Sequence, residues 1–161
     1  MNETINAETV FTIEPGRQEV SATRDFAAPP DLVFRTCTDP ATLPLWWGPR
    51  DLTTTVEVME PRTGGRWRFV QRDPQGNEFA FHGVYHEVTP SRIVDTFEFE
   101  GMPGHVLLET TTFEAVDGGT RMTVTSVFQS TADRDGMVAS GMQHGMTESH
   151  DRLAELLADR S

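Results

Sequence analysis

The sequence predicts an α+β fold in which a curved antiparallel sheet of six or seven strands wraps around a long C-terminal helix. From Trp67 to Phe128, strand-like segments alternate with turn residues. From Asp133 to Ala158 there is neither a proline nor a β-rich run, and apolar residues recur at helical spacing. This helix carries small residues, which should leave space between helix and sheet: Gly141, Gly145 and Ser149.

Length, charge and cysteine content limit the possible classes of protein. A chain of 161 residues is expected to form one domain. The net charge of −12 argues against binding to nucleic acid or to an anionic membrane, because both need clustered basic residues. The single cysteine, Cys37, excludes an internal disulfide, and neither a leader nor a membrane-spanning stretch is recognised. We therefore expect a cytoplasmic protein.

The N-terminal third is expected to hold a strand and two short helices. Residues 1–16 read as a loose arm that precedes a single domain over residues 17–161, and Gln18 to Ala27 reads as the first strand. Pro29-Pro30 opens a short helix that runs to Cys37, since proline is tolerated in the first helical turn. Asp39-Pro40 opens a second short helix, expected to end near Pro44.

Turn residues set the register of the strands that follow. A loop at Asp73–Asn77 pairs Phe69 with Phe81 and Trp67 with Gly83. Because side chains alternate between the two faces of a strand, this register places four aromatic residues on one face. They are Trp67, Phe69, Phe79 and Phe81. An aromatic ring opposite Gly83 is also typical of a glycine covered by its neighbour.

Two further turns place carboxylates on the same inward face. Turns at Asp117-Gly118-Gly119 and at Gly101–Gly104 put Glu109 opposite both Asp95 and Ser126. A turn at Pro90-Ser91 adds either His86 or Tyr85 beside Asp95, and a bulge at Gly83 would decide which one. We expect a polar row of His86 (or Tyr85), Asp95, Glu109 and Ser126. Burial and mutual repulsion would raise the carboxyl pKa values.

The C-terminal helix presents one face to this sheet. Its members recur every three or four residues: Val138, Met142, Gly145, Met146, Ser149, Leu153 and Leu156. Glycine within a helix costs up to ~1 kcal/mol relative to alanine, so these glycines serve either close helix packing or room for a ligand. The predicted walls of the resulting cavity are Trp47, Trp67, Phe69, Phe79, Phe81, Phe97, Thr111, Val124, Met142, Met146 and Ser149.

The sequence resembles the bacterial ATPase-activator (Aha-type) proteins of the START/SRPBCC helix-grip superfamily. The segments that carry the resemblance include FAAPPDLVFRTCTDPATLPLWWGP, GGRWRF, FHGVYHEVTPSRIV, FEGMPGH, DGGTRMTVT and SGMQHGMTESHDRLAELL. The resemblance implies a helix-grip fold that holds a hydrophobic small molecule between sheet and helix. It carries over no catalytic motif. The eukaryotic co-chaperone of this family uses an additional N-terminal domain, for which this chain has no room.

Three functions follow as hypotheses. The first is binding of a hydrophobic or aromatic small molecule, with Asp95 and Glu109 orienting a polar group on it. The second is an enzyme of the cyclase or hydrolase type that uses the polar row. The third is a chaperone-linked interaction module with a tightly filled cavity. Its apolar outer face, which would also suit a homodimer contact, would include Val94, Val106, Leu108 and Val127.

Other chemistry is not indicated by the sequence, which favours a binding protein over an enzyme. His82 and His86 would stand ~13 Å apart on a strand, too far apart to share a metal ion. Cys37 lies in an apolar helix without an evident partner and reads as a buried small hydrophobe. Nucleotide-binding loops and nucleophile elbows are not recognised. We therefore expect neither a metal nor a cofactor.

Overall fold

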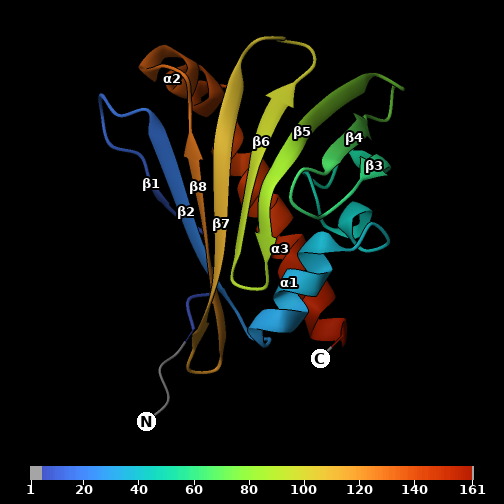
Figure 1. The fold of residues 1–161 in the computed structure, drawn as a ribbon, viewed down its shortest axis with the longest axis vertical. Coiled ribbons are helices and arrows are strands. Elements are labelled where there is room, and N and C mark those ends of the chain that lie inside the picture. Colours follow the sequence, from blue (N-terminus) through green and yellow to red (C-terminus); the bar gives the residue numbers. More distant parts are fainter. Residues whose placement is uncertain (1–4, 161) are drawn as a thin grey trace.

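The computed structural model describes residues 5–160, which form one antiparallel sheet and three α-helices (Figure 1). The spatial order of the eight strands is β1-β2-β8-β7-β6-β5-β4-β3. The strands are β1 (Val10–Thr12), β2 (Glu19–Phe26), β3 (Thr53–Met59), β4 (Arg66–Arg72), β5 (Glu78–Thr89), β6 (Arg92–Phe99), β7 (Val106–Val116) and β8 (Gly119–Val127). The helices are α1 (Pro30–Thr38), α2 (Thr131–Ala139) and α3 (Met142–Arg160), with a 3-10 turn, η1, at Leu43–Leu45.

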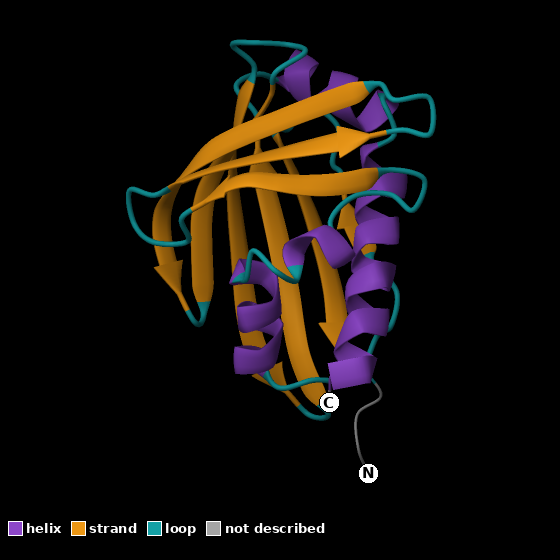
Figure 2. Cartoon of the chain, turned by 90° about the vertical axis from the view of Figure 1, so that its right-hand side faces the viewer, coloured by secondary structure: helices purple, strands orange, loops and turns teal. Residues whose placement is uncertain are grey.

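The sheet curves around α3, and α1 with η1 lies across its lower end (Figure 2). The core forms where these layers meet, and Phe26, Val33 and Leu153 are almost completely buried there. This arrangement confirms the predicted α+β helix-grip fold, although the sheet has eight strands rather than six or seven. None of the helices in residues 5–160 is long and apolar enough to cross a membrane.

The additional strand corrects the expectation of a loose N-terminal arm. Residues 10–12 form β1 and pair with β2 at the edge of the sheet. The backbone N–H of Asn6 donates to Asp25 Oδ2 at 2.9 Å, and Thr9 Oγ1 lies 3.0 Å from His150 Nδ1 on α3. Residues 1–4 of the arm lie outside the described residues. From residue 5 onward, the arm is therefore attached to the sheet and to the C-terminal helix.

The hairpin registers confirm the pairings expected from the turns. Trp67 pairs with Gly83, and Asp95 pairs with Glu109. Between β5 and β6, however, the bulge lies between Tyr85 and Glu87 rather than at Gly83. Tyr85 is consequently the partner of Asp95, and His86 is the bulged residue. Up to Tyr85, every second side chain of β5 therefore points to the inner face of the sheet.

The predicted C-terminal helix is two helices, because α2 and α3 are separated at Ser140-Gly141. Gly141 has a φ of +100°, a left-handed conformation that commonly ends helices and is accessible to glycine at little cost. The second short helix near Pro44 is also corrected: a 3-10 turn runs from Leu43 to Leu45 and includes the proline. Helical periodicity alone shows neither the break between α2 and α3 nor the 3-10 geometry at Pro44.

A candidate ligand cavity between sheet and helix

A cavity of about 440 Å³ lies between the inner face of the sheet and α3. This volume is within the range of roughly 300–1,000 Å³ that is usual for small-molecule sites. The cavity has aromatic, aliphatic and polar sections, and residues from η1 to α3 contribute to it. Its position is the one that the alternation of the strands predicts.

Aromatic rings form one wall of the cavity. The Trp47 ring lies edge-on to Phe69 and Phe81, with centroid distances of 5.1 and 5.5 Å. Trp67 and Phe97 extend this wall, their ring centroids 5.9 Å apart. Edge-on and tilted pairs are favourable for aromatic rings, so this wall is well packed and presents a broad apolar surface to the cavity.

The loop that carries Trp47 is fixed to α3. The backbone N–H of Gly48 donates to Ser149 Oγ at 2.8 Å. Arg152 donates to the carbonyl oxygens of Gly48 and Leu45, at 2.8 and 3.1 Å. The Ser149 hydroxyl is thus used as an acceptor by the loop, as well as lining the cavity. These bonds hold the indole of Trp47 in place as a wall rather than as a mobile cover.

The helical wall is made of small and flexible side chains. Gly145 lines the cavity together with Met142 and Met146. A Cβ atom added at Gly145 would meet no atom within 4 Å, so this glycine is not required by close packing of helix on sheet. Of the two explanations left open by the sequence, the structure favours room for a ligand. Methionine side chains adapt readily to the shape of what they contact.

A polar row crosses the inner face of the sheet. Tyr85, Asp95, Glu109 and Ser126 are successive cross-strand partners on β5, β6, β7 and β8. All four line the cavity. Tyr85 and Ser126 are buried, whereas the two carboxyl groups keep partial access to the cavity itself. The row places two acidic groups side by side on a largely apolar cavity surface.

Burial determines the electrostatics of this row. It raises the pKa of Asp95 well above its ordinary value, and the charge of Glu109 raises it further. Burial also raises the pKa of Glu109 to about 7, although the Ser126 hydroxyl favours its ionised form. The pair therefore titrates as a unit that holds a proton near neutral pH. No arginine is among the described residues that line the cavity.

Trp67 adds an unusual donor beside Asp95. Its Nε1–H is buried and has no hydrogen-bond partner of normal geometry among the described residues. It is close enough to lower the pKa of Asp95, but this influence is smaller than those of burial and Glu109. A Cβ at Gly83 would come within 2.6 Å of the Trp67 Nε1 atom, so the glycine is needed for the indole to lie there.

The remaining titratable groups of the cavity are neutral at pH 7. Burial lowers the pKa of His150 to about 4 and raises the pKa of the Cys37 thiol to about 12. It also raises the pKa of Tyr85 above its ordinary value. A thiol of such high pKa is a poor nucleophile, in line with the interpretation of Cys37 as a small apolar residue. The described residues include no group of three or more metal-ligating side chains.

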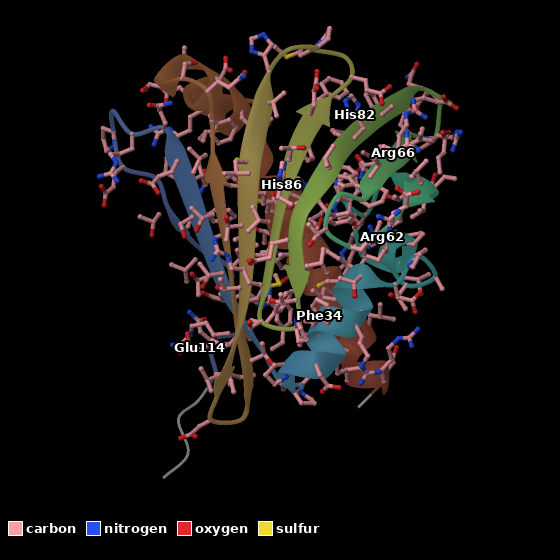
Figure 3. All side chains as sticks on the ribbon, viewed as in Figure 1. Phe34, Arg62, Arg66, His82, His86 and Glu114 are labelled. Carbon is pink, nitrogen blue, oxygen red and sulfur yellow. The ribbon has the colours of Figure 1, made fainter. Side chains whose placement is uncertain are left out.

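Two of the predicted site residues lie elsewhere. Phe79 is half-buried at the start of β5, next to the Asp73–Asn77 loop, and does not line the cavity. His86 is exposed and does not line it either; in Figure 3 it is labelled on β5, with α3 behind the sheet. The bulge explains His86, because one extra residue reverses which side chain points inward. All the other predicted wall and polar-row residues line the cavity.

Sequence reasoning also missed several lining residues. Gln71 follows Trp67 and Phe69 at period two, so the same alternation identifies it. His150 lies four residues after Met146, and Leu157 four residues after Leu153, both at helical spacing. His150 lines the cavity. Leu157 does not line it but is buried in the core, whereas Leu156 is only partly buried. The helix is thus rotated slightly from the predicted orientation.

Solved structures share this fold over nearly the whole chain. A protein from Rhodobacter sphaeroides is 29% identical, with a TM-score of 0.87 over 94% of this chain and 99% of its own. Protein Ms6760 from Mycobacterium smegmatis is 25% identical, with a TM-score of 0.84 over 96% of this chain and 99% of its own. DynU16, from the dynemicin biosynthetic locus, shows the fold alone: it is 21% identical, with a TM-score of 0.65 over 88% of this chain and 47% of its own.

Comparison with curated proteins finds no match. The profile of one family, described as Activator of Hsp90 ATPase homolog 1-like protein, matches residues 27–158. This match spans α1, the strands from β3 to β8 and most of α3, and so includes every wall of the cavity. Together with the agreement in fold, it places the chain in the family of Activator of Hsp90 ATPase homolog 1-like proteins.

Proposed function

We propose that this protein binds an apolar or aromatic small molecule in the cavity between the sheet and α3. The observation that carries the proposal is a cavity of about 440 Å³ with an aromatic wall and two neighbouring acidic groups. Ligand sites typically combine a mostly apolar lining with a few polar groups that fix orientation. Here Asp95 and Glu109 would orient a polar group on the ligand.

The apolar lining is sufficient for useful affinity. Removing about 300 Å² of apolar ligand surface from water contributes roughly 7 kcal/mol at ~25 cal/mol per Å², before the costs of association. The rigid Trp47 loop and the packed aromatic rings reduce the ordering required on binding. The flexible Met142 and Met146 would adapt to the shape of the ligand.

The interaction-module hypothesis has less support. It predicted a tightly filled cavity, and the cavity is open. The outer face does expose Leu108 and Val127, cross-strand partners that are 43% and 41% exposed. Val94 and Val106 are half-buried on the same face. A homodimer contact there, a chaperone partner and a cytoplasmic location all stay predictions.

Thermal melting against a panel of fatty acids, flavonoids, polyketides and steroids tests the proposal. A ligand at a hundred times its dissociation constant should stabilise the fold by ~2.7 kcal/mol, which is a shift of several degrees for a domain of this size. A shift confined to one chemical class would support cavity binding and identify the class. Melting temperatures that stay constant across the panel would contradict it.

A further inference from the structure

A buried hydroxyl group lines the cavity without a hydrogen-bond partner. Tyr85 is 5% exposed, and none of the hydrogen bonds among residues 5–160 involves its phenol oxygen. Within these residues, the fully enclosed side-chain atoms without a partner are Arg24 Nε and Trp67 Nε1, so the Tyr85 oxygen keeps access to the cavity. A buried polar group without a partner costs free energy, and this hydroxyl is therefore suited to a partner on a ligand.

The two acidic groups of the cavity lie next to this hydroxyl. Tyr85 is the cross-strand partner of Asp95, and Asp95 is the partner of Glu109. The Cβ atoms of such partners are about 4.5–5.5 Å apart, so the three side chains can converge on one group of a ligand. All three line the cavity, and both carboxyl groups keep partial access to it. Burial raises the pKa of Tyr85, and the charge of Asp95 raises it further, in line with their proximity.

These three side chains provide hydrogen-bond acceptors but no cation. Ionised carboxyl groups only accept hydrogen bonds, and a phenol oxygen can accept as well as donate. None of the described residues that line the cavity is an arginine or a lysine. His150 lines the cavity, but burial lowers its pKa to about 4, so it is neutral at pH 7. The positive charge that would match the two carboxylates therefore has to come with the ligand.

We propose that the cavity binds a primary amine carried on an aromatic or aliphatic body, a proposal that rests on the binding function proposed above and names its ligand class. The ammonium group donates its three hydrogens to Asp95, to Glu109 and to the Tyr85 oxygen. Its positive charge favours the ionised forms of the two carboxyl groups, which burial alone disfavours.

The apolar body of the amine has a surface to lie on directly beside the acceptors. Phe97 is two residues from Asp95 on the same inward face of β6, and its ring centroid is 5.3 Å from that of Phe81. Trp47 continues this wall, 5.5 Å from Phe81. A short link between the amine and an aromatic or aliphatic group therefore places the apolar part on the aromatic wall.

Other head groups match these acceptors less well. A neutral alcohol has a single O–H and donates to only one acceptor, whereas a primary ammonium group carries three N–H donors. A carboxylate or phosphate would meet two acidic side chains and neither arginine nor lysine among the described lining residues. A quaternary ammonium group has the charge but no N–H to donate. The primary amine is the head group that uses the whole set.

Four naphthalene probes with different head groups test the proposal. They are 2-(2-naphthyl)ethylamine, its N,N,N-trimethyl derivative, 2-(2-naphthyl)ethanol and 3-(2-naphthyl)propanoic acid. Isothermal titration calorimetry at pH 7 measures the four dissociation constants. We expect the primary amine to bind about tenfold or more tighter than each of the others, the effect of at least one hydrogen bond to a charged group.

Each other pattern of binding contradicts the proposal. Equal or tighter binding of the alcohol or the acid would overturn the amine assignment and leave cavity binding intact. Tighter binding of the trimethyl derivative would mean that the aromatic rings, rather than the three acceptors, hold the cation. If none of the four binds although another compound class raises the melting temperature, the amine site is wrong and the cavity function stands. If no compound of any class binds, both proposals fail.

A pair of glutamate variants locates the amine. Glu109→Gln keeps the size of the side chain and removes its charge, so the preference for amine over alcohol should fall by roughly 30-fold or more, as for a buried charge pair that loses one partner. Glu114→Gln removes an exposed carboxylate from the same strand and should keep the wild-type preference. The same preference in both variants would mean that the acidic surface attracts the amine, and would overturn the proposal.

Two further variants test the remaining acceptors. Asp95→Asn should reduce the preference for the amine as Glu109→Gln does. Tyr85→Phe removes only the hydroxyl and should weaken amine binding by about tenfold. Because this hydroxyl has no partner among residues 5–160, the melting temperature of the ligand-free Tyr85→Phe protein should stay near that of wild type. Wild-type amine affinity in Asp95→Asn or in Tyr85→Phe would overturn the three-acceptor site.

Discussion

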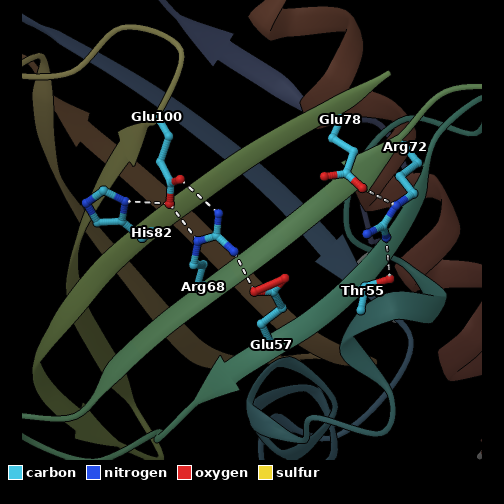
Figure 4. Close-up of polar contacts among 7 residues, drawn as sticks. All are labelled: Thr55, Glu57, Arg68, Arg72, Glu78, His82 and Glu100. Atoms are coloured by element: carbon cyan, nitrogen blue, oxygen red, sulfur yellow. Dashed lines mark hydrogen bonds and ion pairs between the residues drawn. The ribbon is translucent and has the colours of Figure 1, made fainter. Parts of the chain in front are cut away.

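Glutamate side chains on the two faces of the sheet have pKa values shifted in opposite directions. On the outer face, Glu100 accepts two hydrogen bonds from the Arg68 guanidinium, at 2.8 and 2.9 Å, and lies 3.0 Å from His82 (Figure 4). These partners lower the pKa of Glu100 to about 2. On the inner face, burial raises the pKa of Glu109 to about 7. The pKa values of the two glutamates differ by about five pH units, although Glu109 lies on β7 and Glu100 directly follows the neighbouring strand β6.

The difference teaches where to look for function. The outer carboxylates are paired with arginines: Arg68 bonds to Glu57 and Glu100, and Arg72 bonds to Glu78. These ion pairs need no functional explanation, since each charge has a partner and access to solvent. The inner carboxyls have no arginine among the described residues that line their cavity, and burial disfavours their charged forms. Groups held in this way usually serve a site, because stability alone would not retain them.

Replacing Glu109 should give the largest stability effect. Its folded-state pKa of about 7 lies above the ordinary 4.5, so the folded protein keeps a proton that the unfolded chain releases between these pH values. Its contribution is therefore complete below about pH 4.5 and is lost as the pH rises through 7. Glu109→Gln stays neutral and should be more stable than wild type at pH 8, by up to about 3 kcal/mol.

Urea unfolding at pH 4.5 and pH 8 measures this prediction. His150 has the opposite slope, because its lowered pKa makes stability rise with pH between about 4 and 6.5. That slope is common to both proteins and cancels in their difference. If the advantage of Glu109→Gln is the same at both pH values, the inner carboxyl is not desolvated as described.

Removing the outer arginine should have a smaller effect. Arg68→Gln leaves Glu57 and Glu100 partly exposed without their cation, and exposed ion pairs typically contribute about 1 kcal/mol or less. The lowered pKa of Glu100 means that this contribution is present above pH 4.5 and is lost as the pH falls through 2. Urea unfolding at pH 7 in low and high salt tests it. If Arg68→Gln lowers the free energy of unfolding by more than about 3 kcal/mol and salt does not reduce this loss, the outer ion pairs are not the weak, exposed pairs described here.

Adding one methyl group to α3 should give the smallest effect. Gly145→Ala should stabilise the protein by about 0.5–1 kcal/mol, because alanine favours the helix and its Cβ meets no atom within 4 Å. Gly136→Ala, at an exposed and equally unobstructed position in α2, is the matched control. Chemical denaturation compares the two. A destabilised Gly145→Ala beside a stabilised Gly136→Ala would mean that helix and sheet are packed closely there.

Local signals predicted most of the fold, and tertiary contacts account for the differences. Turn residues and alternation set the pairing of Asp95 with Glu109 and of Trp67 with Gly83, because hairpin register depends on nearby residues. The choice between Tyr85 and His86 depended on a bulge whose position the turns do not define. The short strand β1 has few contacts of its own and forms by pairing with β2. Phe11 and Ile13 alternate with Val10 and Thr12 and pack against the core, so the interpretation of a loose arm overlooked a short period-two pattern.

The site was predictable to the extent that its residues follow regular spacing. Trp67, Phe69 and Phe97 were identified because their strands alternate up to the cavity. The burial of the Trp67 N–H could not be anticipated, since it depends on how the indole lies over Gly83. The hydrogen bond from the Gly48 N–H to Ser149 Oγ joins residues 101 positions apart, so no local sequence pattern predicts it.

The most direct test of the central claim fills the cavity without disturbing the fold. Gly145→Leu places a side chain into the open space beside Met146, and Gly136→Leu adds the same side chain to an exposed part of α2. Thermal melting is recorded for both, with the compound that most stabilises the wild-type protein. We predict that Gly145→Leu folds but loses the ligand-induced shift, while Gly136→Leu keeps it. An equal shift in both variants would show that the ligand does not bind in this cavity.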